Sequence, residues 1–226
     1  MSTSKFWRET VFRIVVVGCL LFLVLTIIAM LIYPGGTLED KTTTGYQFLY
    51  NFFSDLGRTI AYSTKVNPAA LLFNFALACA GIALGLFFVS YTQFFTARAA
   101  RLLSFLGSIA GVLSAFGFIG IALTPANLNR PLHLQFVFWA FRFFLLAMLV
   151  YLPASLLQPG FPRKFSLVLI IFTILLAMYT ALITFGPDPE IGQGLIIQVT
   201  GQKIIAYASV ICILLLANGA RENKVN

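Results

Sequence analysis

Charged side chains are scarce in this chain: Asp, Glu, Lys and Arg make up only 10% of its 226 residues. Soluble domains carry about 25% charged residues and about 45–50% apolar ones, whereas 60% of this sequence is hydrophobic and its mean hydropathy is +0.95. Its apolar runs also have the length of a bilayer crossing, about 17–25 residues. The composition excludes an ordinary soluble domain and predicts a polytopic membrane protein.

Histidine and cysteine are nearly absent. His133 is the only histidine, and the three cysteines, Cys19, Cys79 and Cys212, fall inside apolar runs. There is no CxxC pair and no Cys/His cluster, so we expect no disulfide and no metal site. No motif indicates a cofactor, and we expect the cysteines to pack as small hydrophobic side chains.

Six membrane spans are predicted, which makes the fold class all-α and residues 1–226 a single transmembrane domain. Proline or glycine marks most of their boundaries. The first span lacks the short apolar core and cleavage site of a signal peptide, so we interpret it as a retained anchor. The spans lie at about 14–33, 68–90, 102–124, 132–152, 165–186 and 194–217.

The basic residues are concentrated on one side of these spans. With the N-terminus inside, nine Lys and Arg fall in inner segments and four in outer ones, while five of the seven acids fall outside. Such a bias predicts that both termini are cytoplasmic. It also accounts for the net charge of +8 without a nucleic-acid partner. The acids of the outer segments are Glu39, Asp40, Asp55, Asp188 and Glu190, and the inner bases include Lys224.

The outer loop between the first two spans has a patterned stretch at about 46–60. On a helical wheel its polar residues, among them Asn51 and Asp55, fall within about 100°, and Tyr46, Leu49 and Phe53 lie opposite. We predict an amphipathic helix that lies at the outer membrane interface or folds over the bundle as a lid.

Two GxxxG motifs, Gly81–Gly85 and Gly107–Gly111, lie in the second and third spans. Small residues at this spacing let helices approach closely. We expect them to pack these two helices within one chain first, and to support a homo-oligomer second.

Polar side chains inside the membrane gather on the three helices that enter from the outside. Arg142 and Lys203 each lie about 14–15 Å into their spans, near the midplane of a core of about 30 Å. An intramembrane base is a functional-site hypothesis by default. The candidate ligand-binding residues are Asn74, Gln135, Arg142, Gln198, Gln202, Lys203 and Asp55.

Two other interpretations of these polar groups stay open. Arg142 could pair with Asp55 or cap carbonyl groups, and Lys203 could bond Tyr207 or a carbonyl, with no ligand involved. A hydrolase built from Ser54, Asp55 and His133 is the least favoured. Adjacent Ser and Asp side chains seldom serve one histidine, and the sequence lacks a GxSxG elbow, so we assign no catalytic residue.

The pattern resembles the prokaryotic six-helix membrane family catalogued as domain of unknown function 998. The resemblance rests on NFFSDLG (51–57), NPAALLFN (67–74), Pro131 with His133, and Gln198 with Gln202. It implies the six-helix fold in a prokaryotic plasma membrane and brings no activity with it.

From these features we predict a membrane protein that binds or senses a lipid or small amphiphile in a polar pocket facing outward. The alternatives are a transporter or channel, and an accessory subunit whose polar groups only fix helix register. Membrane lipids are the expected partners.

Overall fold

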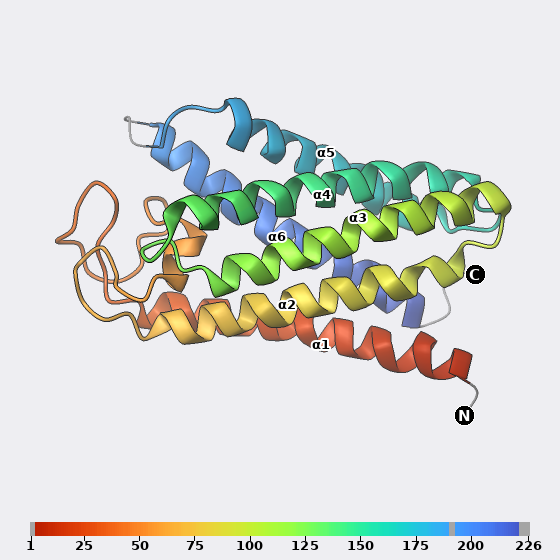
Figure 1. The fold of residues 1–226 in the computed structure, drawn as a ribbon, viewed down its shortest axis with the longest axis horizontal. Coiled ribbons are helices and arrows are strands. Elements are labelled where there is room, and N and C mark those ends of the chain that lie inside the picture. The colour runs from red at the N-terminus through yellow and green to blue at the C-terminus, as the bar shows by residue number, and fades with distance from the viewer. Residues whose placement is uncertain (1–2, 190–192, 222–226) are drawn as a thin grey trace.

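The computed structural model describes residues 3–189 and 193–221. Over these residues the chain is helical, and six helices are long and apolar enough to cross a membrane, which confirms that prediction. Two short 3-10 helices, η1 and η2, also occur (Figure 1). The elements are α1 (Thr3–Ile32), η1 (Phe53–Gly57), α2 (Ala69–Tyr91), η2 (Thr92–Phe94), α3 (Arg98–Leu123), α4 (Arg130–Leu157), α5 (Arg163–Phe185) and α6 (Gly194–Arg221).

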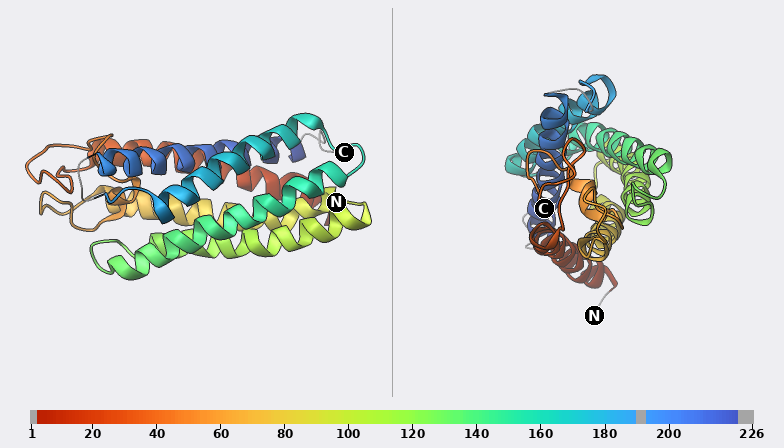
Figure 2. Two further views of the ribbon diagram at one scale, coloured as in Figure 1. Left: turned by 90° about the horizontal axis from the view of Figure 1, so that it is seen from above. Right: turned by 90° about the vertical axis from the view of Figure 1, so that its left-hand side faces the viewer.

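The six helices form a closed ring. Each packs against its neighbours in sequence, and α6 packs against α1 (Figure 2). Residues 33–68 cover one end of the ring, which we call the loop end. The start of α1 and the end of α6 lie at the other, which we call the termini end (Figure 1). Glu190, counted above among the outer acids, and Lys224, counted among the inner bases, lie outside the described residues.

The GxxxG glycines make their close contacts inside the chain. A side chain at Gly81 would meet Ile119 of α3, and one at Gly107 would meet Tyr151 of α4. At Gly111 it would overlap the ring of Phe88 on α2. The two motifs therefore set the spacing of α2, α3 and α4.

Several helices extend beyond the predicted spans: α1 begins at Thr3 rather than at 14, and α6 ends at Arg221 rather than at 217. The fourth helix also differs at a proline. Pro153, expected to end the fourth span at 152, lies inside α4, which continues to Leu157. Proline has no amide hydrogen, so Pro153 cannot donate a hydrogen bond to the Leu149 carbonyl four residues before it. The Leu149 side chain is 51% exposed, so this bond is lost on the outer face of α4.

The amphipathic helix predicted at about 46–60 is not present. That stretch consists of turns followed by η1. The Asn51 side chain accepts from the Gln47 amide at 2.9 Å and donates to the Gly36 carbonyl at 2.8 Å. Such bonds from side chain to backbone compete with helix formation. Burial does not follow the predicted faces either, because Asn51 and Asp55 are buried together with Phe53, while Leu49 is exposed.

Candidate functional site: two adjoining cavities at the loop end

Side chains of α2 and α6 hold the 33–68 segment in the mouth of the ring. Lys203 Nζ donates to the Asn51 carbonyl at 2.6 Å. Gln202 Oε1 accepts from the Phe53 amide at 2.7 Å, and Asn74 Nδ2 donates to the Gly57 carbonyl at 3.1 Å. Buried backbone groups need such partners. Three of the predicted site residues therefore serve to anchor this segment.

Lys203 is almost fully enclosed, with 2% of its surface exposed. Its Nζ lies 5.4 Å from the centre of the Tyr46 ring and 5.0 Å from that of Phe48, distances typical of cation–π contacts. It also lies 3.5 Å from the Val199 carbonyl of its own helix. The side chain thus contacts one carbonyl oxygen and two aromatic rings of the covering segment.

Asp55 is buried in the same segment. Its Oδ2 accepts from the Phe52 amide at 2.8 Å and from Asn51 Nδ2 at 3.3 Å. Burial raises the pKa of this carboxyl to about 6, although nearby Arg58, the two hydrogen bonds and Lys203 all lower it. Asp55 therefore titrates near neutral pH.

A cavity of about 500 Å³ lies between this segment and helices α4, α5 and α6. We call it the polar cavity because ionisable and amide side chains line it. Its volume is in the range of small-molecule sites, about 300–1,000 Å³. The lining residues that carry polar side chains include Ser54, Asp55, Arg58, Asn127, Arg130, His133, Gln198 and Gln202.

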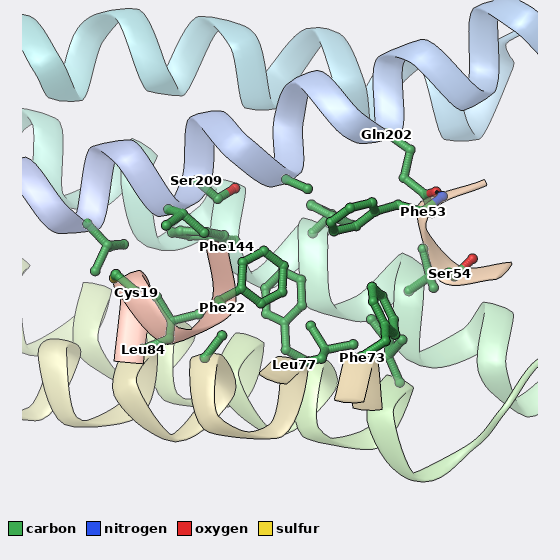
Figure 3. A pocket seen from close by; sticks show the side chains of 18 residues that line it. Cys19, Phe22, Phe53, Ser54, Phe73, Leu77, Leu84, Phe144, Gln202 and Ser209 are labelled. Atoms are coloured by element: carbon green, nitrogen blue, oxygen red, sulfur yellow. Dashed lines mark hydrogen bonds between the residues drawn. The ribbon is translucent and has the colours of Figure 1, made fainter. Parts of the chain in front are cut away.

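A second cavity of about 100 Å³, the apolar cavity, lies deeper in the ring (Figure 3). Aromatic and aliphatic side chains make up most of its wall, among them Phe22, Phe73, Leu77 and Phe144, and it runs from Phe53 and Gln202 toward Cys19 and Ser209. It is smaller than the cavity of about 150 Å³ that is known to bind benzene. Ser54, Val137 and Gln202 line both cavities, so the two adjoin.

The structure separates the predicted site residues into three groups. Asp55, Gln198 and Gln202 line the polar cavity. Asn74 and Lys203 hold the covering segment. Gln135 is exposed on α4, and Arg142 is half-buried on that outward face; neither lines the two cavities.

His133 lines the polar cavity without joining a catalytic triad. Its Nδ1 lies 2.7 Å from the Thr124 carbonyl. A carbonyl can only accept, so Nδ1 carries the proton in the neutral ring. Asp55 bonds Phe52 and Asn51 instead, and within the described residues no hydrogen bond joins Ser54, Asp55 and His133.

Sequence reasoning missed Arg58 and Asn127 as cavity residues. Asn127 accepts from the Thr59 amide at 2.9 Å and donates to the Thr59 hydroxyl at 2.8 Å, which ties the 124–129 loop to the covering segment. The sequence did not indicate the apolar cavity, because its lining side chains are of the same apolar types as the rest of the core. Only the path of the 33–68 segment brings Phe53 and Ser54 to its mouth.

Comparison with known proteins finds no matching family model, no matching curated protein and no matching solved structure. The resemblance to the six-helix family described above stays a prediction.

Proposed function

We propose that this protein binds a small amphiphile or lipid at the loop end, with the polar part in the polar cavity and a short segment of the apolar part in the apolar cavity, which holds about 100 Å³. The observation that carries the proposal is that the two cavities adjoin at Ser54, Val137 and Gln202. An amphiphile has the same division into a polar and an apolar part.

The chemistry of the polar cavity suits a charged or hydroxyl-bearing headgroup. Arg58 and Arg130 bring positive charge, and Gln198, Gln202 and His133 bring hydrogen-bonding groups. Arg58 also lies 4.0 Å over the Tyr62 ring, which orients its guanidinium. We infer that the loop end faces outward in a prokaryotic plasma membrane, because the bases concentrate at the other end.

Binding is favoured over transport because aromatic side chains fill the termini end of the ring. Phe12, Phe87 and Tyr91 pack edge-to-face or stacked with centres 4.6–6.3 Å apart. Tyr91 also contacts Phe94 and Tyr151 at 5.6 and 5.9 Å. These closely packed rings occupy the path that a solute would need to continue inward.

Replacing Ala206 with Phe tests the proposal, because Ala206 lines the apolar cavity. We expect mass spectrometry of the purified wild type to show at least one amphiphile enriched over bulk membrane lipids, and Ala206→Phe to lose it. Ile204→Phe is the matched control, since Ile204 is 54% exposed on the same helix. Identical profiles in wild type and folded Ala206→Phe would contradict the proposal.

A further inference from the structure

Arg142 lies outside both cavities, on the membrane-facing side of α4 and α5. Its Nη2 donates to the Thr184 hydroxyl at 3.4 Å, a long hydrogen bond. Its guanidinium carbon lies 5.2 Å from the centre of the Phe138 ring and 5.8 Å from that of Trp139. The Trp139 side chain is 53% exposed, so this surface is open.

The guanidinium of Arg142 reaches a shallower level than the position of its Cα suggests. Arg142 is twelve residues into α4, about 18 Å from the start of that helix. Thr184, however, is the second-last residue of α5. Helix α5 ends short of the tips of α4 and α6 (Figure 1). With 23 residues it is about 34 Å long, close to the thickness of the hydrocarbon core. The guanidinium therefore lies near the level of lipid headgroups.

The hydrogen-bonding capacity of Arg142 is mostly unused by the protein. A guanidinium has five N–H groups and keeps its charge, and here one of them meets one hydroxyl. The Thr184 hydroxyl itself donates to the Thr180 carbonyl at 2.7 Å, so its oxygen is free to accept. Among the described residues no carboxylate pairs with Arg142. A cation at the level of the headgroups attracts an anionic group.

We propose that Arg142, Thr184 and Trp139 form a second binding site, which takes the anionic headgroup of a membrane phospholipid. The guanidinium binds the phosphate, the Thr184 hydroxyl keeps the guanidinium directed toward the end of α5, and the exposed Trp139 ring lies along the first part of the acyl chains. Amphipathic aromatic rings favour this depth of the bilayer. The site is separate from the two cavities and does not depend on their proposed function.

Trp139 provides a direct test. With Trp7→Phe, it is the only tryptophan of the full chain. We reconstitute that protein into phosphatidylcholine vesicles and compare quenching by brominated phosphatidylglycerol with quenching by brominated phosphatidylcholine. Relative association of the anionic lipid should be about fivefold higher, which corresponds to about 1 kcal/mol for one cation near the surface. Arg142→Gln should bring the ratio to about one.

Arg163→Gln is the matched control, because Arg163 is an exposed arginine at the other end of α5; it should keep the wild-type ratio. A ratio near one in the Trp7→Phe protein, which keeps Arg142, overturns the proposal. This outcome does not depend on whether Arg142→Gln folds. A preference that survives in Arg142→Gln overturns it as well. The Ala206→Phe variant should retain the preference, so failure of the cavity proposal and failure of this one are distinguishable.

Discussion

At the scale of single residues, side chains of the same type have very different surroundings. Gln202 accepts a hydrogen bond from the Phe53 amide at 2.7 Å, whereas Gln135 is exposed on the outer face of α4. Helical periodicity places Gln135, Trp139 and Arg142 on one face of that helix. It does not say whether that face points to the ring interior, and here His133 and Val137 do. The sequence therefore located these polar residues on their helices but not the direction in which they point.

Removal of the Gln202 acceptor should destabilise the protein. In Gln202→Leu the amide of Phe53 loses its acceptor, and leaving a buried donor unsatisfied costs about 1–3 kcal/mol. We expect a clear fall in Tm in detergent micelles. Gln135→Leu, on the exposed face, should leave Tm nearly unchanged; equal Tm values for the two variants would argue against the anchoring role.

Asp55 should make stability depend on pH. The folded protein holds the Asp55 proton more tightly than the unfolded chain, because burial raises the pKa from 3.8 to about 6. Its contribution is therefore fully present below about pH 4 and is lost as pH rises through 6, with a magnitude of about 3 kcal/mol. Tm of the wild type relative to Asp55→Asn should fall from pH 4 to pH 7. A constant difference between the two proteins would show that Asp55 is not buried as described.

At the scale of helices, long apolar runs and their proline or glycine ends were sufficient to locate all six spans. The prediction failed at 46–60, where the periodicity of a helix is present but local bonds from Asn51 and Asp55 hold the backbone in turns. It also failed at Pro153, where the helix continues past the proline to Leu157. Periodicity expresses neither the bonds from side chain to backbone at 46–60 nor the continuation of a helix through a proline.

The glycine motifs allow a matched pair of substitutions. A methyl group at Gly111 would overlap the Phe88 ring, whereas one at Gly85 would lie 3.5 Å from the Ala115 side chain, an ordinary contact. Gly111→Ala should lower stability by about 1–3 kcal/mol through overpacking, and Gly85→Ala should be tolerated. Thermal unfolding of the two variants checks this, and equal stability would contradict the close approach.

The same two variants bear on the homo-oligomer, which stays a prediction. If the motifs serve only to pack helices of one chain, light scattering in detergent should give both variants the oligomeric state of the wild type. A state that changes in Gly85→Ala, where the substitution fits within the chain, would indicate that the motif also contacts a second copy.

At the scale of the whole molecule, the charge bias of the sequence and the helix ring of the structure together predict one orientation of the protein in the membrane. The structure places residues 33–68 at one end and the start of α1 and the end of α6 at the other, and the bias predicts that the basic end is cytoplasmic. The candidate site could be predicted only in part: three of its polar residues came from the sequence, but the cavity itself depends on how the covering segment enters the ring.

Cysteine labelling in intact cells tests this orientation. In a background with Cys19, Cys79 and Cys212 replaced by alanine, Thr42→Cys places an exposed thiol at the loop end and Thr96→Cys places one at the termini end. A membrane-impermeant maleimide should label position 42 in intact cells and position 96 only after permeabilisation, because the basic segments resist translocation. The opposite pattern would mean that the loop end and its two cavities face the cytoplasm. The amphiphile would then have to come from the inner leaflet.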